Sequence, residues 1–250
     1  MNIELTRGEI NWLQALAEVV LITFGVLGAL AVDSWWADRD AAERERVQLE
    51  ALRVEMRDNL NRFELLIKDQ IDVLGSQRQL LRVIHGVDPT PSAAEVGRLV
   101  YQSRRFFRLE PVMGAYEALV ASGDLRLVGS AELRAELARF YGNTAHGHED
   151  EELSTLYRIE FTRSIVEATD FLAVVPPEAR DLYGPPESHF SIDVESVLNS
   201  RSLSSYLVLL LRTEYYITEY YQRIRGDAAD IIRLINIEIG DLDRTTKTSN

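Results

Sequence analysis

The hydrophobic positions of the chain begin with one nearly continuous apolar block. Residues 12–36 read WLQALAEVVLITFGVLGALAVDSWW, close to the ~20 apolar residues that cross a hydrocarbon layer of ~30 Å. The uncharged part, residues 19–32, is shorter than a full span, and apolar runs of that length also occur as buried core helices. We predict a transmembrane helix within an N-terminal unit of residues 1–38, with a core helix as the alternative.

Aromatic and charged residues at the ends of this block favour the membrane interpretation. Indole rings prefer the headgroup level of a bilayer, and tryptophans stand at both ends, at Trp12, Trp35 and Trp36. A cleaved signal peptide fits less well, because Arg7 lies among acidic residues and no A-x-A-like site cleanly precedes Asp33. The block is therefore interpreted as an uncleaved single-pass anchor, with the lipid bilayer as its partner.

One face of the predicted span carries residues suited to helix association. Gly25 and Ala29 form a small-xxx-small pair, and Glu18 lies seven residues before Gly25, so all three share a helical face. A carboxyl group roughly one turn inside the span must be protonated, paired or hydrated. We predict self-association through this face. The alternative is that the small residues only reduce crowding on a lone anchor.

After the block, apolar residues recur at steps of three and four, which is typical of one stripe along an amphipathic helix. The stripe comprises Leu49, Leu52, Met56, Leu60, Phe63, Ile67, Ile71 and Leu74. No proline or glycine occurs between Ala41 and Leu74, so the span is predicted to continue as a long rigid stalk helix. This helix is expected to end near Gly86.

The middle of the body shows several helix boundaries. Ser92 followed by Glu95 is a capping box, which predicts a short helix after the loop HGVDPTPS. Residues 111–141 indicate two helices joined by a tight Ser-Gly-Asp turn, the second capped by Ser130. Between them lies a short apolar linker that is expected to be buried, formed by Leu125, Leu127 and Val128.

The apolar pattern of the last hundred residues also predicts helices, so the predicted fold class is all-α. A helix is expected over residues 149–175, up to paired prolines, and then a polar loop to Phe190. The last apolar stripe, interrupted by Glu214, comprises Leu207, Leu210, Ile217, Tyr221, Ile224, Ala228, Ile231 and Ile235. The two long striped helices are predicted to pair antiparallel as the spine of a helical bundle. The body is placed at residues 39–242, and residues 243–250 are expected to be a disordered tail.

Two stretches resemble an uncharacterised family of bacterial proteins that begin with a single membrane helix. The first carries the pattern E-(I/V)-V-L-x-x-x-G-x-L-x-A-L-x-x-(N/D)-x-W at Glu18, Val19, Val20, Leu21, Gly25, Leu27, Ala29, Leu30, Asp33 and Trp35. The second is a helix, an S-G turn and an L-R-x-x-L helix, at Tyr116, Ser122, Gly123, Leu125, Leu133, Arg134, Leu137 and Tyr141. The resemblance implies a bacterial inner-membrane location and no assigned catalytic residues.

The orientation of the anchor is left open by two opposing indications. Arg7 precedes the span, whereas Arg39, Arg44 and Arg46 follow it, and the positive-inside rule then places the body in the cytoplasm. The resemblance implies the opposite, because members of that family often have a basic tail before the anchor, which keeps the tail inside and the body outside. That basic tail is missing from this chain.

Composition excludes several classes of chemistry. The formal net charge of -13 at pH 7 argues against nucleic acid as a partner, because nucleic-acid-binding proteins neutralise phosphates with clustered Lys and Arg. The chain has no cysteine, which excludes disulfides, thiolate nucleophiles and Cys-ligated zinc. Common phosphate-binding, dinucleotide-binding, zinc-protease and nucleophile-elbow motifs do not occur, so no cofactor is predicted and catalysis is a minority hypothesis.

A histidine pair is a minor candidate for metal binding. His146 and His148 precede Glu149 and Asp150, and imidazole with carboxylate suits a divalent transition ion. Residues at i and i+2 do not share a helical face, so the site would need a loop and further ligands such as His85 or His189. The alternative is a polar break between helices.

Two aromatic clusters are candidates for binding. Arg104, Arg105 and Arg108 flank Phe106 and Phe107, a combination that suits an anionic lipid headgroup. The alternative for these arginines is pairing with the many acidic residues of the chain. The tyrosines at positions 215, 216, 220 and 221 form a stripe suited to ligand stacking or, more commonly, to helix packing.

The leading functional hypothesis is a membrane-anchored helical protein that self-associates or serves as an accessory or scaffold subunit beside larger membrane partners. A second hypothesis is a channel-like homo-oligomer in which Glu18 lines a water-filled path. A metal-dependent enzyme built around His146 and His148 ranks last.

Overall fold

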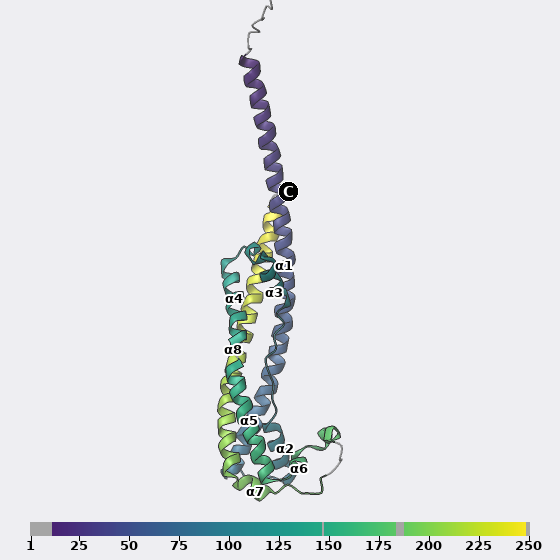
Figure 1. The fold of residues 1–250 in the computed structure, drawn as a ribbon, viewed down its shortest axis with the longest axis vertical. Coiled ribbons are helices and arrows are strands. Elements are labelled where there is room, and N and C mark those ends of the chain that lie inside the picture. Colours follow the sequence, from purple (N-terminus) through teal and green to yellow (C-terminus); the bar gives the residue numbers. More distant parts are fainter. Residues whose placement is uncertain (1–11, 147, 184–187, 249–250) are drawn as a thin grey trace, which may run out of the picture.

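The computed structural model describes the backbone of residues 12–146, 148–183 and 188–248. All regular structure in these ranges is helical, as the sequence predicts. The first helix, α1 (Trp12–Ile84), projects alone from one end of an elongated bundle and then runs along the length of the bundle (Figure 1). The predicted fold class is therefore confirmed: a long apolar N-terminal helix that continues into a stalk and then a helical bundle.

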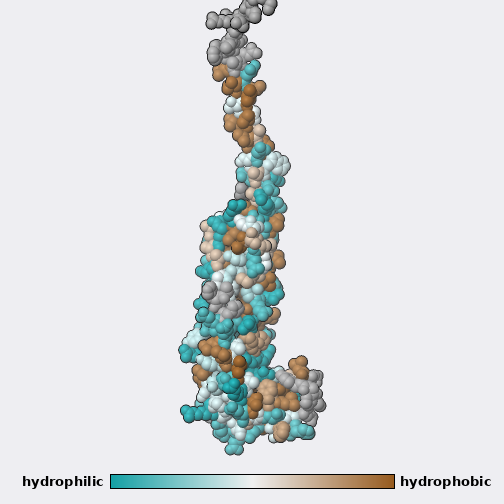
Figure 2. Space-filling model, in the orientation of Figure 1, coloured by the Kyte–Doolittle hydropathy of each residue, from teal (hydrophilic) through white to brown (hydrophobic). Residues whose placement is uncertain are grey.

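Helix α1 is a single uninterrupted element of 73 residues. It contains the one segment of the described residues that is long and apolar enough to cross a membrane, and none of that segment is buried inside the chain. Figure 2 shows hydrophobic residues crowding the projecting part, in contrast to the largely hydrophilic surface of the body. The helix ends just before Gly86, whose φ of 66° is a left-handed conformation that favours glycine.

The last helix, α8 (Arg201–Thr248), returns along α1 in the antiparallel direction, as predicted (Figure 1). The two helices pack through their apolar stripes, most of whose residues are buried, whereas Ile71 of the predicted α1 stripe is 50% exposed. On α1 the core residues include Leu49, Leu52, Met56 and Phe63, and on α8 they include Ile217, Tyr221, Ile224, Ala228, Ile231 and Ile235. Burial of about 25 cal/mol per Å² of apolar surface makes this seam the main stabilising contact of the body.

Shorter elements connect and cover the two long helices. They are α2 (Ala93–Ser103), α3 (Gly114–Ser122), the 3-10 helix η1 (Asp124–Leu127), α4 (Ala131–His146), α5 (His148–Ala168), α6 (Phe171–Val174), the 3-10 helix η2 (Pro177–Tyr183) and α7 (Val194–Asn199). Helices α4 and α5 pack on α8, and α2 packs on α1. A second apolar core forms at the end of the bundle far from the projecting helix, with Leu80, Leu99, Phe161, Leu203 and Leu207 among its members.

The predicted helix boundaries in the middle of the chain are largely correct. The Ser92 hydroxyl accepts a hydrogen bond from the Glu95 N–H, and the Ser130 hydroxyl accepts one from the Leu133 N–H. Gly123 ends α3 with a φ of 75°, as the Ser-Gly-Asp turn requires. In the linker, Val128 is fully buried, whereas Leu125 and Leu127 are half-buried.

The connection between α2 and α3, residues 104–113, runs along the bundle with almost no regular structure. We call this segment the strap. It begins beside Gln77 of α1, whose side-chain amide donates to the Ser103 carbonyl at 3.0 Å, and it ends beside Glu55 of α1. The 22 residues of α1 between these points rise about 33 Å, which is also the reach of about ten extended residues. The strap is therefore stretched nearly straight along α1.

Two predictions of the sequence are corrected. The helix expected over residues 149–175 is broken, because Asp170 turns the chain after α5 and accepts a hydrogen bond from the Ala173 N–H as the N-cap of α6. The tail expected to be disordered from residue 243 continues α8 as far as Thr248. Asp243 is held there by an ion pair of 2.5 Å with Arg46 of α1, and Leu242 packs at the edge of the core.

Candidate functional site

The predicted association face lies on the projecting part of α1. Glu18, Gly25 and Ala29 are all exposed, and no atom of the described residues lies within 4 Å of where a Cβ of Gly25 would stand. Positions 18, 25 and 29 share one side of the helix because steps of seven and four residues both return close to a whole number of turns. The body leaves this face open to a partner.

The predicted aromatic end of the apolar segment is also exposed. The rings of Trp35 and Trp36 pack edge to face with their centroids 5.2 Å apart, and the Arg39 guanidinium lies 5.5 Å from the Trp35 ring centroid. Indole beside a cation at the end of an apolar helix is the arrangement found at a membrane surface. The side chain of Trp12 lies outside the described residues.

A groove follows directly where α1 meets the end of α8. Its volume is about 640 Å³, and its lining includes Trp36, Arg39, Glu43, Arg46 and Leu242. The Arg46 guanidinium is already bonded to Asp243, and Asp40 at the groove wall is bonded to Arg44 at 3.0 Å. The charges here are therefore largely compensated within the chain.

Below the groove, two carboxyl groups accept hydrogen bonds from the backbone of one loop. The Glu45 side chain of α1 accepts a hydrogen bond of 2.6 Å from the Gly129 N–H, and the Glu238 side chain of α8 accepts one of 2.9 Å from the Ser130 N–H. A Cβ at Gly129 would lie 2.7 Å from a Glu238 carboxyl oxygen, so a side chain there would require that carboxyl group to move. Burial raises the pKa of Glu45, and the nearby Glu238 charge raises it further, against the Gly129 hydrogen bond, which lowers it.

Further buried side chains hold the end of the strap that lies nearer the projecting part of α1. Both polar atoms of the Asn59 amide bond the backbone of Val112, at 2.7 Å to its N–H and 2.8 Å to its carbonyl. The Glu55 carboxylate accepts hydrogen bonds from the Ala115 and Tyr116 N–H groups at the start of α3, at 2.6 and 3.3 Å. A carboxylate at a helix N-terminus satisfies free N–H groups and favours the helix dipole.

Tyrosine hydroxyls complete these carboxylate sites. The Tyr141 hydroxyl donates to Glu55, and burial together with that carboxylate raises the pKa of Tyr141. The Tyr221 hydroxyl donates to Glu151 at 2.7 Å, and burial together with that carboxylate raises the pKa of Tyr221. Glu151 also accepts a hydrogen bond of 3.2 Å from the Leu109 N–H in the strap. Both tyrosines therefore stay protonated and act as donors.

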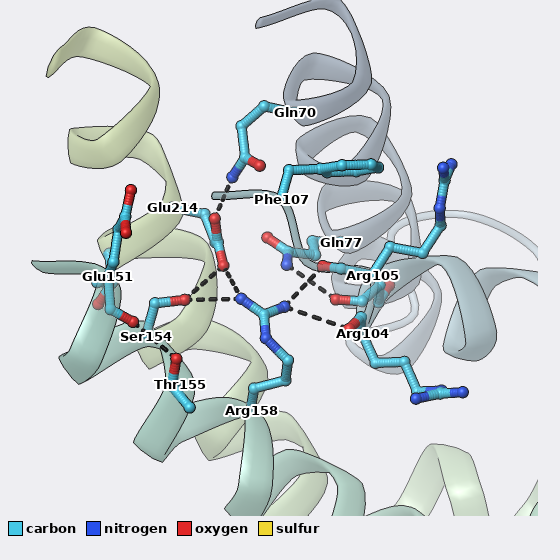
Figure 3. Close-up of polar contacts among 12 residues, drawn as sticks. Gln70, Gln77, Arg104, Arg105, Phe107, Glu151, Ser154, Thr155, Arg158 and Glu214 are labelled. Carbon is cyan, nitrogen blue, oxygen red and sulfur yellow. Dashed lines mark hydrogen bonds and ion pairs between the residues drawn. The ribbon is translucent and has the colours of Figure 1, made fainter. Parts of the chain in front are cut away.

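An ion pair between α5 and α8 holds the other end of the strap (Figure 3). The Arg158 guanidinium bonds Glu214 and donates to the carbonyls of Arg104 and Arg105, at 3.2 and 2.7 Å. Ser154 donates to Glu214 at 2.5 Å, and the Gln70 side chain of α1 donates to the same carboxylate. One buried charge pair thus joins α1, α5, α8 and the strap.

The predicted arginine cluster lies in the strap, and its geometry favours pairing within the chain over lipid contact. The Arg108 guanidinium lies 3.2 Å from Glu151, and Arg104 lies over the rings of Tyr101 and Phe171 at 4.9 and 4.8 Å. The Arg105 guanidinium lies over Phe107 at 4.8 Å. The strap begins at the level of Gln77, which is 41 residues after Trp36 and therefore about 60 Å along α1 from the aromatic end of the apolar segment.

The tyrosine stripe serves mainly in packing. Tyr221 is fully buried, and the Tyr220 hydroxyl donates to the Asn143 carbonyl at 2.9 Å. Burial raises the pKa of Tyr220 to about 12. Tyr215 and Tyr216 are exposed neighbours with ring centroids 5.8 Å apart. Tyr220 and Tyr221 therefore take part in helix packing, as predicted.

The candidate metal ligands are not brought together in the part of the chain that the structure describes. His146 ends α4 and His148 begins α5, but the side chains of both lie outside the described residues. His85 bonds the Ser204 hydroxyl at 3.2 Å, and His189 is exposed in the connection before α7. No group of three or more His, Cys, Asp or Glu side chains suited to a metal ion occurs among the residues searched.

Sequence reasoning missed the buried polar residues, although a signal for them exists. Asn59 occupies a buried position of α1 between Met56 and Phe63, next to Leu60 of the predicted stripe, and Glu214 interrupts the stripe of α8 between Leu210 and Ile217. A polar residue in phase with a core stripe is buried with its neighbours and must find hydrogen-bonding partners. Such positions predict a buried polar contact. The sequence pattern alone indicated only that Glu214 interrupts the apolar stripe.

Comparison with protein-family models, with curated proteins and with solved structures returned no match. The likeness to the uncharacterised membrane family therefore stays a prediction from two sequence patterns. The function has to be argued from the geometry of this chain.

The Arg158–Glu214 pair gives a first prediction for stability. Replacing Arg158 with Met leaves the Glu214 charge buried without its cation, which should cost about 3–5 kcal/mol of unfolding free energy. Adding Glu214→Leu removes that charge, so the double variant should be more stable than Arg158→Met alone. Urea unfolding of the full chain in mild detergent measures this. Simple addition of the two single-variant losses would contradict the charge argument.

The Glu45–Glu238 pair gives a prediction for pH dependence. Because the pKa of folded Glu45 is raised above its ordinary 4.5, its stabilising contribution is complete below that value and is lost as pH rises through the folded pKa. Glu45→Gln keeps the acceptor for Gly129 and removes the charge. The variant should therefore gain stability relative to the natural chain as pH rises from the ordinary 4.5 of this carboxyl to neutral pH.

Unfolding of both chains across that pH range is the measurement. Glu43→Gln is the matched control, because Glu43 lies on the same helix and is exposed. A stability difference that stays constant with pH for Glu45→Gln would contradict the raised pKa.

Proposed function

We propose that the protein is anchored in the bacterial inner membrane by one span and acts as a self-associating scaffold or as an accessory subunit of a larger membrane complex. The observation that carries the proposal is the bare apolar part of α1. Leu21 and Phe24 are 76% and 72% exposed, and the remaining large apolar residues of this part are exposed too. Such a surface is stable only in lipid or against another protein.

The rest of the chain supports a structural role. The buried carboxylates and Arg158 are all bonded to backbone groups or to each other. Their hydrogen bonds hold the strap and the loop at Gly129 in place, so these side chains serve the fold. The exposed face at Glu18, Gly25 and Ala29 supplies the small residues that allow two helices to approach closely in a bilayer. A single span carrying such a face suits assembly with other membrane helices.

A channel-like oligomer is the second candidate. It is favoured by one observation, the position of the exposed Glu18 carboxyl on the same face as Gly25, where helices of an oligomer would meet. Reconstituted bilayers separate the two candidates. A conductance that is abolished by Glu18→Gln supports the channel, and a complete lack of conductance from the assembled full chain excludes it.

Membrane anchoring is tested by fractionation of cells that express the full chain. The natural chain should sediment with membranes and require detergent for release. Leu21→Lys together with Phe24→Lys should shift it toward the soluble fraction, because each central lysine costs about 2.5–3.5 kcal/mol on insertion. Leu156→Lys, at an exposed apolar position of α5, is the control that should still sediment. Recovery of the natural chain in the supernatant without detergent would end the anchor proposal.

Self-association is tested by substituting the two glycines of the span. Gly25→Leu should block close helix approach and reduce the oligomer severalfold in native mass spectra from mild detergent. Gly28→Leu is the matched control, because it adds the same side chain about 60° around the helix from Gly25 and about 100° from Ala29. A natural chain that is monomeric under these conditions, or equal effects of the two variants, would contradict association through this face.

A further inference from the structure

A row of exposed apolar residues runs along α1 where the helix belongs to the body. Val47, Val54 and Leu65 are 57%, 65% and 66% exposed, although the core of the same helix is tightly buried. Ala29, Val47 and Leu65 are spaced by 18 residues, and 18 residues make five full turns of an α-helix. These three residues therefore lie on one straight line that starts in the apolar segment.

Trp36 belongs to the same row. It precedes Val54 by 18 residues, and it follows Ala29 by seven residues, which places it about 20° from the line. Trp36 is 60% exposed. The outer row of α1, defined as Ala29, Trp36, Val47, Val54 and Leu65, is thus continuous from the predicted span into the stalk.

The body packs on the opposite side of α1 and leaves this row free. Met56 follows Val47 by nine residues, and Leu74 follows Leu65 by nine, which is two and a half turns in each case. Met56 is fully buried and Leu74 is 4% exposed. A second long helix could lie along the outer row as far as Leu65; further along the same side, Ser76 is bonded to Gln102 of α2 and Val83 is 5% exposed.

We propose that the outer row of α1 is the contact surface for α1 of a second copy, packed parallel and in register from the membrane along the stalk. This inference rests on the proposed membrane anchor and self-association, because insertion gives both copies the same direction. Their tryptophans then lie at the same depth, so each residue of the row faces its own counterpart. The 18-residue repeat equals 3.6 residues per turn, which suits straight helices rather than a left-handed supercoil.

The charges beside the row are compatible with such a pair. Asp40 and Asp58, again 18 residues apart, lie about 20° from the line, as close to it as Trp36, so their counterparts in the second copy would approach. Asp40 is bonded to Arg44 at 3.0 Å and Asp58 to Arg62 at 2.9 Å. Each acidic group is therefore neutralised within its own chain, which limits like-charge repulsion across the contact. A second copy also repeats the 18-residue spacing by construction, which an unrelated helix would have to match.

Cysteine crosslinking of the full chain in membranes tests the proposal. Because the chain has no cysteine, Val47→Cys, Val54→Cys and Leu65→Cys each introduce one thiol. Ile71→Cys is the matched control, since Ile71 is an aliphatic residue of the same helix that is 50% exposed and lies about 120° around from Leu65. Mild oxidation should link the three row variants into dimers severalfold more than the control, because a disulfide requires Cβ atoms about 4 Å apart.

The outcomes separate this inference from the function on which it rests. Equal linking at Ile71→Cys, or no linking at the three row positions, overturns the stalk contact. If the natural chain is nevertheless an oligomer by native mass, association through the span stands and the stalks diverge. If it is a monomer and no row variant is linked, both proposals fail together.

Discussion

The packing of α1 against α8 is the contact on which the rest of the molecule depends. Each helix buries a single apolar stripe, and the two stripes meet through residues such as Met56 and Ile224, which are fully buried. Helices α2, α3, α4 and α5 pack onto this pair, and α6 packs on α2, so their positions depend on the spine. The same packing uses one side of α1 only. The helix therefore keeps a second, exposed side from its apolar part as far as Leu65.

The strap imposes the second constraint. A stretched segment lying against a bundle cannot bond its own backbone, and buried N–H and C=O groups without partners cost roughly 1–3 kcal/mol each. The side chains of Asn59, Glu151 and Arg158 supply those partners. This explains why polar residues occupy positions of the core stripes that would otherwise be apolar. It also explains why the carboxylates lie at the joints between α1, α5 and α8 rather than in one cluster.

The sequence predicted the parts of the fold that depend on periodicity and local capping. The long stripes of α1 and α8, their antiparallel pairing, and the caps at Ser92 and Ser130 follow from residues close together in the chain. The break at Asp170 was missed because the apolar residues on both sides of it keep a helical pattern. The helical end of α8 was missed because its stabilising partner, Arg46, lies at the other end of the sequence.

The candidate site was predictable only in part, for the same reason. The spacing of Glu18, Gly25 and Ala29 predicts that they share one face of a single helix, and association through that face stays a prediction. The arginines of the strap were also recognised, but their partners are contributed by other elements, such as Glu151 for Arg108. The proton-sensitive contact of Glu45 with Glu238 joins residues from α1 and α8 on a glycine of a third segment. No local pattern contains that contact.

The unbroken helix α1 couples the orientation of the body to the orientation of the apolar part of the helix. Because α1 is continuous from Trp12 to Ile84, rotation of its apolar part about the helix axis turns the core face of the stalk by the same angle. The direction in which each body points is therefore set by whichever face of α1 is used inside the membrane. Contact through the face that contains Ala29 places Met56 on the far side, since 27 residues make seven and a half turns. Two copies joined there would hold their bodies back to back, with α8 and the strap of each facing outward and open to other partners.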